Sequence, residues 1–524
     1  MRGILNRNLG LLESLQPRLF LLDFEPEPDG LADVRERLLA RCALRMTTNQ
    51  VGAAHGPAFV GLKKSHAVVH DGTFLAPAAG CQKHSRRRKE SGKSTCHFLP
   101  GSHGLRRVSA FPLTPRREFL RQAGWLAAGA ALAAKLPRAF AADDTGVVGS
   151  VTLPFENGER ELVAYPQKRP LIRLTTRPPQ LETPFAVFND GLVTPNDAFF
   201  VRYHLSEIPL RIDPAAHRVA VRGLVQTPLS LSLADLKALG DPVEFYAVNQ
   251  CSGNSRGFFS PRANGGQLGH GAMGNAKWTG VPLRRVLERA GVGAGAKQVS
   301  FRGLDRSPIE ATPVFAKALD LDHALDGEVM IAWAMNGTDL PMLNGYPVRL
   351  VVPGYYGTYW VKHLSEIEVL DHGFDGFWMA KSYRIPDNPT HSVEPGTSPA
   401  ATVPINKLAV RSFITSPAAG ASVSTYLTLT ARGIAFDAGS GIREVAFSAD
   451  GGATWQATNL GAELGRYAFR EWKTTFKINA PGPVRLMARA TNRAGETQPL
   501  EASWNPSGYM RNVVEAVEIR AARM

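Results

Sequence analysis

Hydrophobic and polar positions alternate with two different periods between residues 190 and 395. His217–Arg222 has the period-2 pattern of a half-buried strand, and Arg349–Val352 is an apolar strand that ends at Pro353-Gly354. Pro282–Ala290 begins with proline and is followed by Gly291, which predicts a helix. Ser230–Leu239 has the spacing of a short amphipathic helix. Strands that alternate with short helices predict a mixed α+β domain.

The segment that precedes this region is rich in proline. It contains strand-like fragments such as Leu171–Leu174 within residues 142–190. We expect this stretch to be extended and to wrap the surface of the α+β domain, which as a whole covers residues 142–395.

The pattern changes after Pro404, where helical periods disappear. Turns such as Asp450-Gly451-Gly452 separate four alternating segments. These segments are Leu427–Thr430, Ile442–Phe447, Phe469–Ile478 and Val484–Ala490. Short strands at this spacing predict an immunoglobulin-like β-sandwich over residues 404–524. The linker Asp387–Val403 is rich in Pro, Thr and Ser and separates the two domains.

The start of the chain has no sustained period. Residues 1–110 carry a basic run, Lys83–Lys89, and we interpret them as disordered or as translated from a wrongly assigned start codon. Residues 111–141 follow the order of a signal peptide. Arg116-Arg117 precede the uncharged run Ala123–Ala134, and Ala139-Phe140-Ala141 closes the segment. The paired arginines predict twin-arginine export to the periplasm.

Charge and apolar length narrow the classes of partner. The formal net charge is +14, but residues 1–141 contain 22 of the 60 Lys and Arg and only 10 of the 46 Asp and Glu. The remainder is nearly balanced, so we expect no nucleic-acid partner. The uncharged run of about 12 residues in the signal peptide is too short to span a bilayer. We therefore expect no membrane span.

Cysteine usage is uneven as well. Cys42, Cys81 and Cys96 lie in the first 141 residues, and Cys251 is the single cysteine after them. A disulfide within the exported chain is therefore impossible. The sequence has no CxxC, HExxH or CxxCH motif, which excludes the common zinc sites, c-type haem and cysteine-bound iron–sulfur clusters on this chain. We predict no haem here.

Four segments combine cationic, thiol and aromatic residues. They are Thr194–His204, Val248–Arg256, Asn344–His363 and Lys381–Pro386. Cys251 follows an apolar strand and precedes a polar turn, with Arg256 five residues on. A thiolate in cationic surroundings is a soft ligand for a heavy transition metal. Because one ligand cannot hold a metal alone, most of the coordination must come from an organic cofactor.

Four cationic side chains in these segments supply fixed positive charge. They are Arg202, Arg256, Arg349 and Lys362. Two such groups suit an anionic cofactor tail and two suit an anionic substrate. We interpret Trp278 and Trp360 as packing residues.

In this order the four segments resemble the sulfite oxidase family of molybdopterin enzymes, and within it the periplasmic bacterial sulfite dehydrogenases. The resemblance covers about 142–524, with the β-sandwich as the family's dimerisation domain. It implies that Cys251 ligates Mo beside one molybdopterin. Arg202, Arg256 and Tyr383 would border the oxo ligand and hold sulfite. His204, Arg349 and Lys362 would hold the pterin or its phosphate. Asn344 replaces a His of many family members, which puts one cofactor contact in doubt.

The resemblance also implies the reaction and the partners. The expected activity is oxidation of sulfite to sulfate, with electrons passed singly to a c-type cytochrome, either a bound subunit or a soluble cytochrome c. The assembly would be a homodimer or a heterodimer with the cytochrome. A sulfane-sulfur dehydrogenase, a methionine-sulfoxide reductase and a non-catalytic binding protein stay open as alternatives. Paired arginines favour a small dianion over a neutral sulfoxide.

Overall fold

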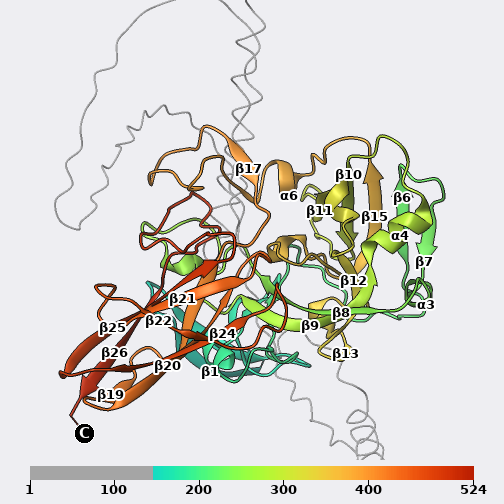
Figure 1. Ribbon diagram of the computed structural model, residues 1–524. Helices are drawn as coiled ribbons and strands as arrows, with labels where there is room; N and C mark the ends of the chain where they lie inside the picture. Colours follow the sequence, from blue (N-terminus) through green and yellow to red (C-terminus); the bar gives the residue numbers. More distant parts are fainter. Residues whose placement is uncertain (1–145, 524) are drawn as a thin grey trace, which may run out of the picture. The chain divides into compact units, whose positions relative to one another are not determined.

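The computed structural model describes residues 146–523. In that part most regular structure is β-strand, arranged in six sheets, and the helices are short (Figure 1). The predicted leader over 1–110 and the predicted signal peptide over 111–141 lie outside the described residues. Among the helices of the described part, none is long and apolar enough to cross a membrane.

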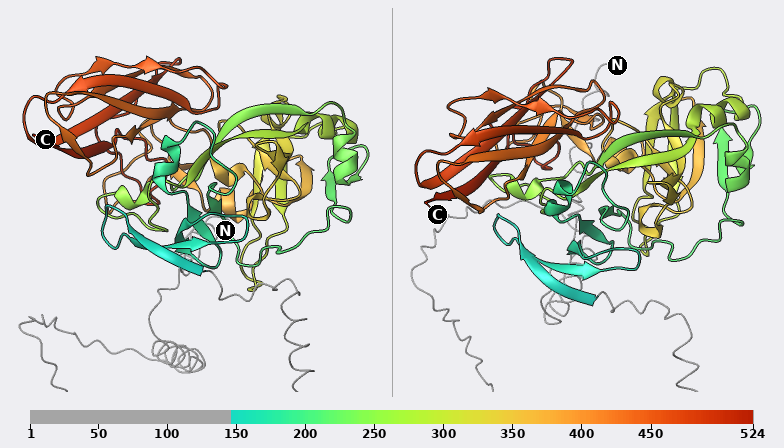
Figure 2. Two further views of the ribbon diagram at one scale, coloured as in Figure 1. Left: turned by 90° about the horizontal axis from the view of Figure 1, so that it is seen from below. Right: turned by 60° about the horizontal axis from the view of Figure 1, so that its bottom comes forward.

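The N-terminal stretch forms an antiparallel sheet in which consecutive strands pair (Figure 2). Its strands are β1 (Gly146–Thr152), β2 (Glu159–Ala164), β3 (Leu171–Thr175), β4 (Gln180–Glu182) and β5 (Val201–Arg202), and η1 (Phe185–Asn189) precedes β5. The expected extended character is present. The prediction that this stretch wraps the surface is wrong for the inner strands, because Leu171 and Leu181 are buried in a core of their own. This sheet places Arg202 at the end of β5.

A second sheet contains two of the segments that the sequence singled out. Its strands are β8 (Val243–Gln250), β9 (Met273–Pro282), β12 (Met330–Met335), β13 (Thr338–Asp339) and β14 (Arg349–Val351). Strand β8 pairs with β9 along its whole length and ends directly before Cys251. Strand β14 pairs with β12 and begins at Arg349. Cys251 and Arg349 are therefore both held at ends of paired strands.

A third sheet lies beside the second and combines parallel and antiparallel pairs. Its strands are β6 (Val219–Gly223), β7 (Leu229–Leu231), β10 (Gln298–Gly303), β11 (Ala316–Asp320) and β15 (Leu364–Leu370). Helices α3 (Leu233–Lys237), α4 (Leu283–Ala290) and α5 (Leu321–Ala324) connect strands of these sheets. The α+β character is present, with more strand than helix.

The local predictions differ from the structure mainly at element ends. The prediction of a helix from Pro282 is confirmed, with Pro282 as the N-cap of α4 and Gly291 in the left-handed region at its end. The prediction of a helix from Ser230 is wrong at its start, because Ser230 lies in β7. A capping box between Ser232 and Asp235 begins the helix at Leu233.

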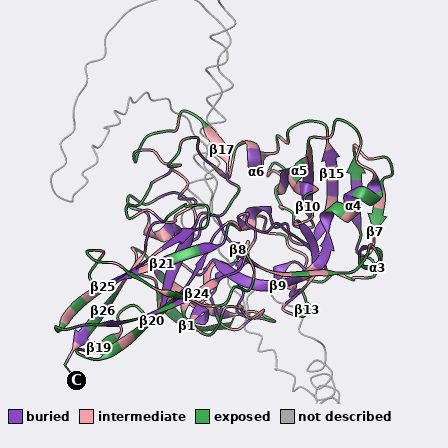
Figure 3. Cartoon of the chain, in the orientation of Figure 1, coloured by how far each residue is buried: buried purple, intermediate pink, exposed green. Residues whose placement is uncertain are grey.

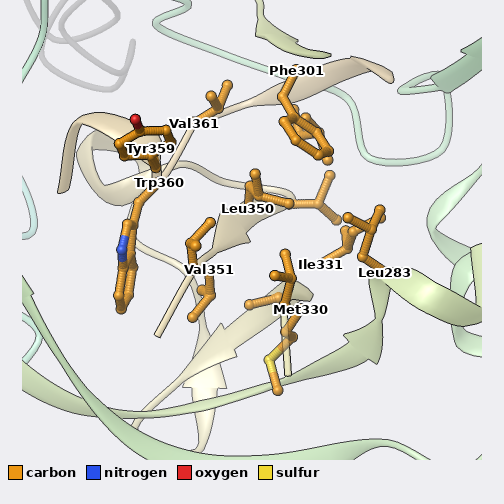
Figure 4. Packing of buried hydrophobic residues seen from close by; sticks show 14 of the residues in the cluster. Leu283, Phe301, Met330, Ile331, Leu350, Val351, Tyr359, Trp360 and Val361 are labelled. Atoms are coloured by element: carbon orange, nitrogen blue, oxygen red, sulfur yellow. The ribbon is translucent and has the colours of Figure 1, made fainter. Parts of the chain in front are cut away.

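A large apolar core joins the second and third sheets (Figure 4). Leu283, Ile331 and Leu350 are fully buried there, and Trp360 lies at one side of the group in the figure. Each fully buried aliphatic side chain contributes about 1.5–3 kcal/mol. This rigid core supports β14 and the loop after it, and so fixes the backbone that carries Arg349 and Lys362.

Short elements connect this part to the C-terminal sheets. They are α6 (Phe377–Ala380), β16 (Arg384–Pro386) and β17 (Thr402–Pro404), and three single turns, η2 (Arg256–Phe258), η3 (Met342–Asn344) and η4 (Gly357–Tyr359), lie before them in the chain. Tyr383 stands between α6 and β16 in the left-handed region, with φ of 57°.

The C-terminal region contains two sheets that share one core. The first consists of β18 (Arg411–Ser416), β20 (Thr428–Phe436), β24 (Arg470–Lys477) and β23 (Asn459–Leu460). The second consists of β19 (Ser422–Ser424), β26 (Ala516–Ala522), β25 (Gly482–Asn492), β21 (Ile442–Ser448) and β22 (Gln456–Ala457). Strand β24 alternates buried and exposed residues, as Figure 3 shows. The immunoglobulin type of this pair stays a prediction.

The C-terminal sheets also contact the sheet that leads to Cys251. The backbone N–H of Val248 in β8 donates to the carbonyl of Tyr467 at 2.8 Å. Val248 of β8 belongs to the same apolar cluster as Phe436 and Phe469 of the C-terminal region. Strand β8 is therefore held from both sides.

Candidate active site

A pocket opens where β8 ends, and six of the seven predicted site residues line it. They are Arg202, His204, Cys251, Arg349, Lys362 and Tyr383. The seventh, Arg256, is not among the lining residues. Residues from β5, the end of β8, β14 and the segment after α6 thus meet at one place, although they are up to 181 positions apart in the chain.

Cys251 lies in a turn that backbone hydrogen bonds fix on both sides. Its N–H donates to the carbonyl of Ala272 at 2.9 Å, and its carbonyl accepts from Asn254 at 3.0 Å. The side-chain oxygen of Asn254 accepts from the N–H of Ala272 at 3.0 Å. Cys251 is buried and has no disulfide partner among the described residues. The thiol is therefore held in place at the pocket wall.

Arg349 is a buried cation without a carboxylate partner among the described residues. It donates to the carbonyls of Asn344 at 2.9 Å and Trp360 at 3.1 Å, and its guanidinium lies 5.1 Å from the Trp278 ring centroid. Burial lowers the pKa of Arg349 to about 9. A group in this state gains free energy from any anion that binds next to it.

Lys362 is a second cation of the pocket and is half-buried. Its ammonium donates to the carbonyl of Arg202 and lies 4.3 Å from the Tyr203 ring centroid. Burial, together with the nearby charge of Arg349, lowers the pKa of Lys362. Arg202 also lines the pocket, so three cationic groups surround a small volume. This concentration of positive charge fits an anionic ligand.

His204 and Tyr383 form a hydrogen-bonded pair on the pocket wall. The His204 Nε2 and the Tyr383 hydroxyl are 2.5 Å apart, and the Nη2 of Arg202 lies 3.5 Å from the same hydroxyl. The His204 ring stacks on Phe315, with centroids 3.7 Å apart. Burial, and then the charges of Arg202 and Lys362, hold the pKa of His204 well below its usual range. His204 is therefore neutral at pH 7.

The hydroxyl of Tyr383 stays protonated for a related reason. Burial raises the pKa of Tyr383 far above its ordinary value, although the charge of Arg202 acts in the opposite direction. The ring stacks on Tyr509, with centroids 5.2 Å apart, and the ammonium of Lys317 lies 5.1 Å from its centroid. The ring is thus fixed while its hydroxyl faces His204 and Arg202.

Arg256 is buried and is not among the residues that line the pocket. Its Nε donates to the carbonyl of Ser507 at 2.9 Å and its Nη1 to that of Gly266 at 3.2 Å. The guanidinium lies 5.0 Å from the Tyr509 ring centroid. Ser255, with φ of 68°, turns the chain so that Arg256 begins η2. Arg256 therefore supports Tyr509 and, through it, Tyr383.

Several lining residues were not predicted from the sequence. Asn249, Ser252 and Thr358 line the pocket, and each has a buried side-chain oxygen without a hydrogen-bond partner in the described structure. Asn249 and Ser252 lie next to Cys251 in the segment Val248–Arg256, so their position in the sequence could have identified them as site residues. Phe315 lies outside every motif. Trp360 packs in the core, as predicted, and also lines the pocket.

Two family models match the chain in the region of this pocket and after it. The oxidoreductase molybdopterin-binding domain matches residues 205–378, and the Mo-co oxidoreductase dimerisation domain matches residues 402–522. Fold and site together therefore define a molybdopterin oxidoreductase. Arg202, His204 and Tyr383 lie just outside the first matched range.

Known relatives narrow the class further. The chain is 33% identical to the sulfite oxidase of Gallus gallus over 364 residues, which cover 66% of this chain and 77% of that protein. It is 31% identical to the mitochondrial sulfite oxidase of Homo sapiens, over 68% of this chain and 66% of that protein. The chain belongs to the sulfite oxidase family of molybdopterin oxidoreductases.

A solved structure supports the fold. The sulfane dehydrogenase SoxCD of Paracoccus pantotrophus matches with a TM-score of 0.55 and 24% identity, over 65% of this chain and 84% of that chain. At 24% sequence identity, this similarity shows a shared fold and nothing more specific.

Proposed function

We propose that this protein oxidises sulfite to sulfate and passes the electrons singly to a c-type cytochrome. The observation that carries the proposal is the convergence of Cys251 with three cationic groups and the His204–Tyr383 pair in one pocket. The family gives the cofactor class, and the pocket's positive charge favours an anionic substrate over a neutral sulfoxide.

The residues present fit a molybdopterin. The pocket is lined by a fixed thiol, and the Nε of Arg349 and the hydroxyls of Ser252 and Thr358 are buried without hydrogen-bond partners in the described part. Buried polar atoms of this kind need partners, which a polar cofactor supplies. Cys251 would ligate the molybdenum, and Arg349 and Lys362 would hold the anionic part of the pterin. The bound group supplies a metal centre that accepts two electrons.

The remaining pocket residues would bind the substrate. Arg202 and Tyr383 both present donors, and the Tyr383 hydroxyl stays protonated because burial raises its pKa. Neutral His204 would accept from or donate to that hydroxyl, and so fix its direction. These groups would orient sulfite and then stabilise the charge of the product in a water-poor site. Arg256 would hold Tyr383 in place through the Tyr509 ring.

The sequence supports our proposals for the location of the protein and for its electron acceptor. The twin-arginine segment over 111–141 supports export of a folded, cofactor-loaded protein to the periplasm. The sequence has no haem-attachment motif, so a separate cytochrome, bound or soluble, is the proposed acceptor. The C-terminal domain supports a homodimer, or a heterodimer in which the cytochrome covers that surface.

Metal analysis and steady-state assays test this proposal together. The purified protein is analysed for molybdenum and assayed with sulfite, a sulfane-sulfur compound and methionine sulfoxide. Cytochrome c and ferricyanide serve as electron acceptors for the first two, and a reduced viologen dye serves as the electron donor for methionine sulfoxide. We expect about one molybdenum per chain and a preference for sulfite. Molybdenum-loaded protein that does not oxidise sulfite would contradict the proposal, and turnover of the sulfane compound instead would identify the alternative activity.

A further inference from the structure

Lys168 lies between β2 and β3, outside both regions that the family models match. Its side chain is 7% exposed. The ammonium donates to the carbonyls of Asn196 at 2.6 Å and Phe199 at 2.9 Å, and to the Oδ1 of Asn344 at 2.6 Å. Three acceptors require three protons, so the arrangement fits the charged form of Lys168.

All three acceptors of Lys168 are uncharged. Among the described residues Lys168 forms no ion pair, since the neighbouring Asp197 is bound by Arg169 at 2.8 Å. A buried ammonium is costly, and burial lowers the pKa of Lys168 to about 7, although the charge of Asp197 acts in the opposite direction. An anion that binds nearby would stabilise this buried cation further.

Asn344 connects this cation to the pocket, which it lines. Two protons of the Lys168 ammonium are donated to backbone carbonyls. The third is donated to the Asn344 side chain, so the atom that accepts it must be the amide oxygen. The amide nitrogen then faces the other way, where it donates one proton to the carbonyl of Phe200 at 3.1 Å and keeps a second. The Asn344 carbonyl accepts from Arg349. Lys168 therefore fixes the orientation of an amide donor next to a buried guanidinium.

A second contact holds the same turn. The side-chain oxygen of Gln167 accepts from the N–H of Met342 at 3.1 Å, at the start of η3. Leu343 packs against the core of the N-terminal sheet. Residues 167–168 thus clamp η3 from the N-terminal segment, and the position of Asn344 depends on a part of the chain that precedes the matched domain.

We propose that Lys168 and Asn344 form a recognition pair for the anionic, phosphate-bearing part of the pterin cofactor. Asn344 donates an amide proton to it, and Lys168 is a positioning residue that orients the amide and adds positive charge from behind. The inference rests on the proposed function, because it takes the cofactor as bound. It assigns a cofactor role to the N-terminal segment and to Asn344, where the sequence left that contact in doubt.

Cofactor retention tests the pair independently of turnover. Lys168→Met, Asn344→Asp and the surface control Lys473→Met are purified as loaded proteins, and molybdenum and pterin per chain are followed during dialysis. We expect both pocket variants to lose cofactor about tenfold faster than wild type, and the control to match wild type. Asn344→Asp gives Lys168 a carboxylate partner, so its cofactor-free form should unfold at higher urea than cofactor-free wild type.

The outcomes separate this inference from the proposed function. Wild-type retention by both pocket variants overturns the pair, even where sulfite turnover supports the proposed function. If Lys168→Met does not fold, Asn344→Asp decides by itself, since faster loss from a more stable protein is not expected of a structural role. Wild-type protein without molybdenum or pterin overturns both proposals.

Discussion

At the scale of single residues, some groups of the site face the pocket, and other groups hold them in position. Tyr383 illustrates both, since its ring is held by Tyr509 and Lys317 while its hydroxyl meets His204. Tyr383→Phe keeps the ring contacts and removes the hydroxyl. We expect kcat/KM for sulfite to fall about 10- to 100-fold, which corresponds to the loss of one or two hydrogen bonds in a buried site.

The unfolding midpoint of Tyr383→Phe should stay close to that of wild type. Tyr426→Phe is the control, because Tyr426 is 56% exposed and should lose neither activity nor stability. Unchanged kcat/KM in Tyr383→Phe would show that the hydroxyl takes no part in the reaction.

At the scale of elements, β18 of the C-terminal region supports the loop that carries Cys251. Arg411 of β18 is fully buried and donates to the Ser255 hydroxyl at 2.7 Å and to Glu515 at 3.1 Å. Arg411→Met removes a buried charge whose partners remain. Urea unfolding should show a loss of about 3–5 kcal/mol.

The double variant Arg411→Met/Glu515→Gln checks the cause of that loss. It removes both charges of the pair, so it should be less destabilised than the sum of the single variants. A loss below about 1 kcal/mol in Arg411→Met would mean that β18 does not support the loop.

The same scale shows what the sequence could and could not predict. Cys251 and Arg349 were predictable because their motifs lie at the ends of strands, and strand ends are local features. Lys168 was not, because its contact with Asn344 joins positions 176 residues apart and no pattern around either residue signals it. Arg256 was predicted as a site residue from its motif; in the structure it does not line the pocket, and its guanidinium lies against the Tyr509 ring.

At the scale of the whole molecule, neutral histidines that are wholly or partly buried make stability depend on pH. Burial lowers the pKa of His270 from 6.5 to about 4, while its ring stacks on Phe258 and its Nδ1 bonds the Ser255 hydroxyl. The unfolded chain therefore binds a proton between pH 6.5 and 4 that the folded chain does not bind. Stability is full above pH 6.5 and falls as the pH decreases through this window.

We expect His270 alone to account for about 2 kcal/mol of the loss in unfolding free energy between pH 7.5 and 5. Denaturant unfolding of wild type and His270→Gln at both pH values measures this contribution, with the exposed His372→Gln as control. The difference between the two pH values should shrink in His270→Gln and not in the control. An equal pH dependence in all three proteins would contradict the assignment.

The central claim is that Cys251 is the protein ligand of a molybdenum centre that oxidises sulfite. The most direct test compares sulfite turnover in Cys251→Ser and wild type, with far-UV circular dichroism and export as checks of the fold. We predict a folded, exported variant whose turnover is lower by at least about 1000-fold, or about 4 kcal/mol in activation free energy. Wild-type sulfite turnover in Cys251→Ser would contradict the account.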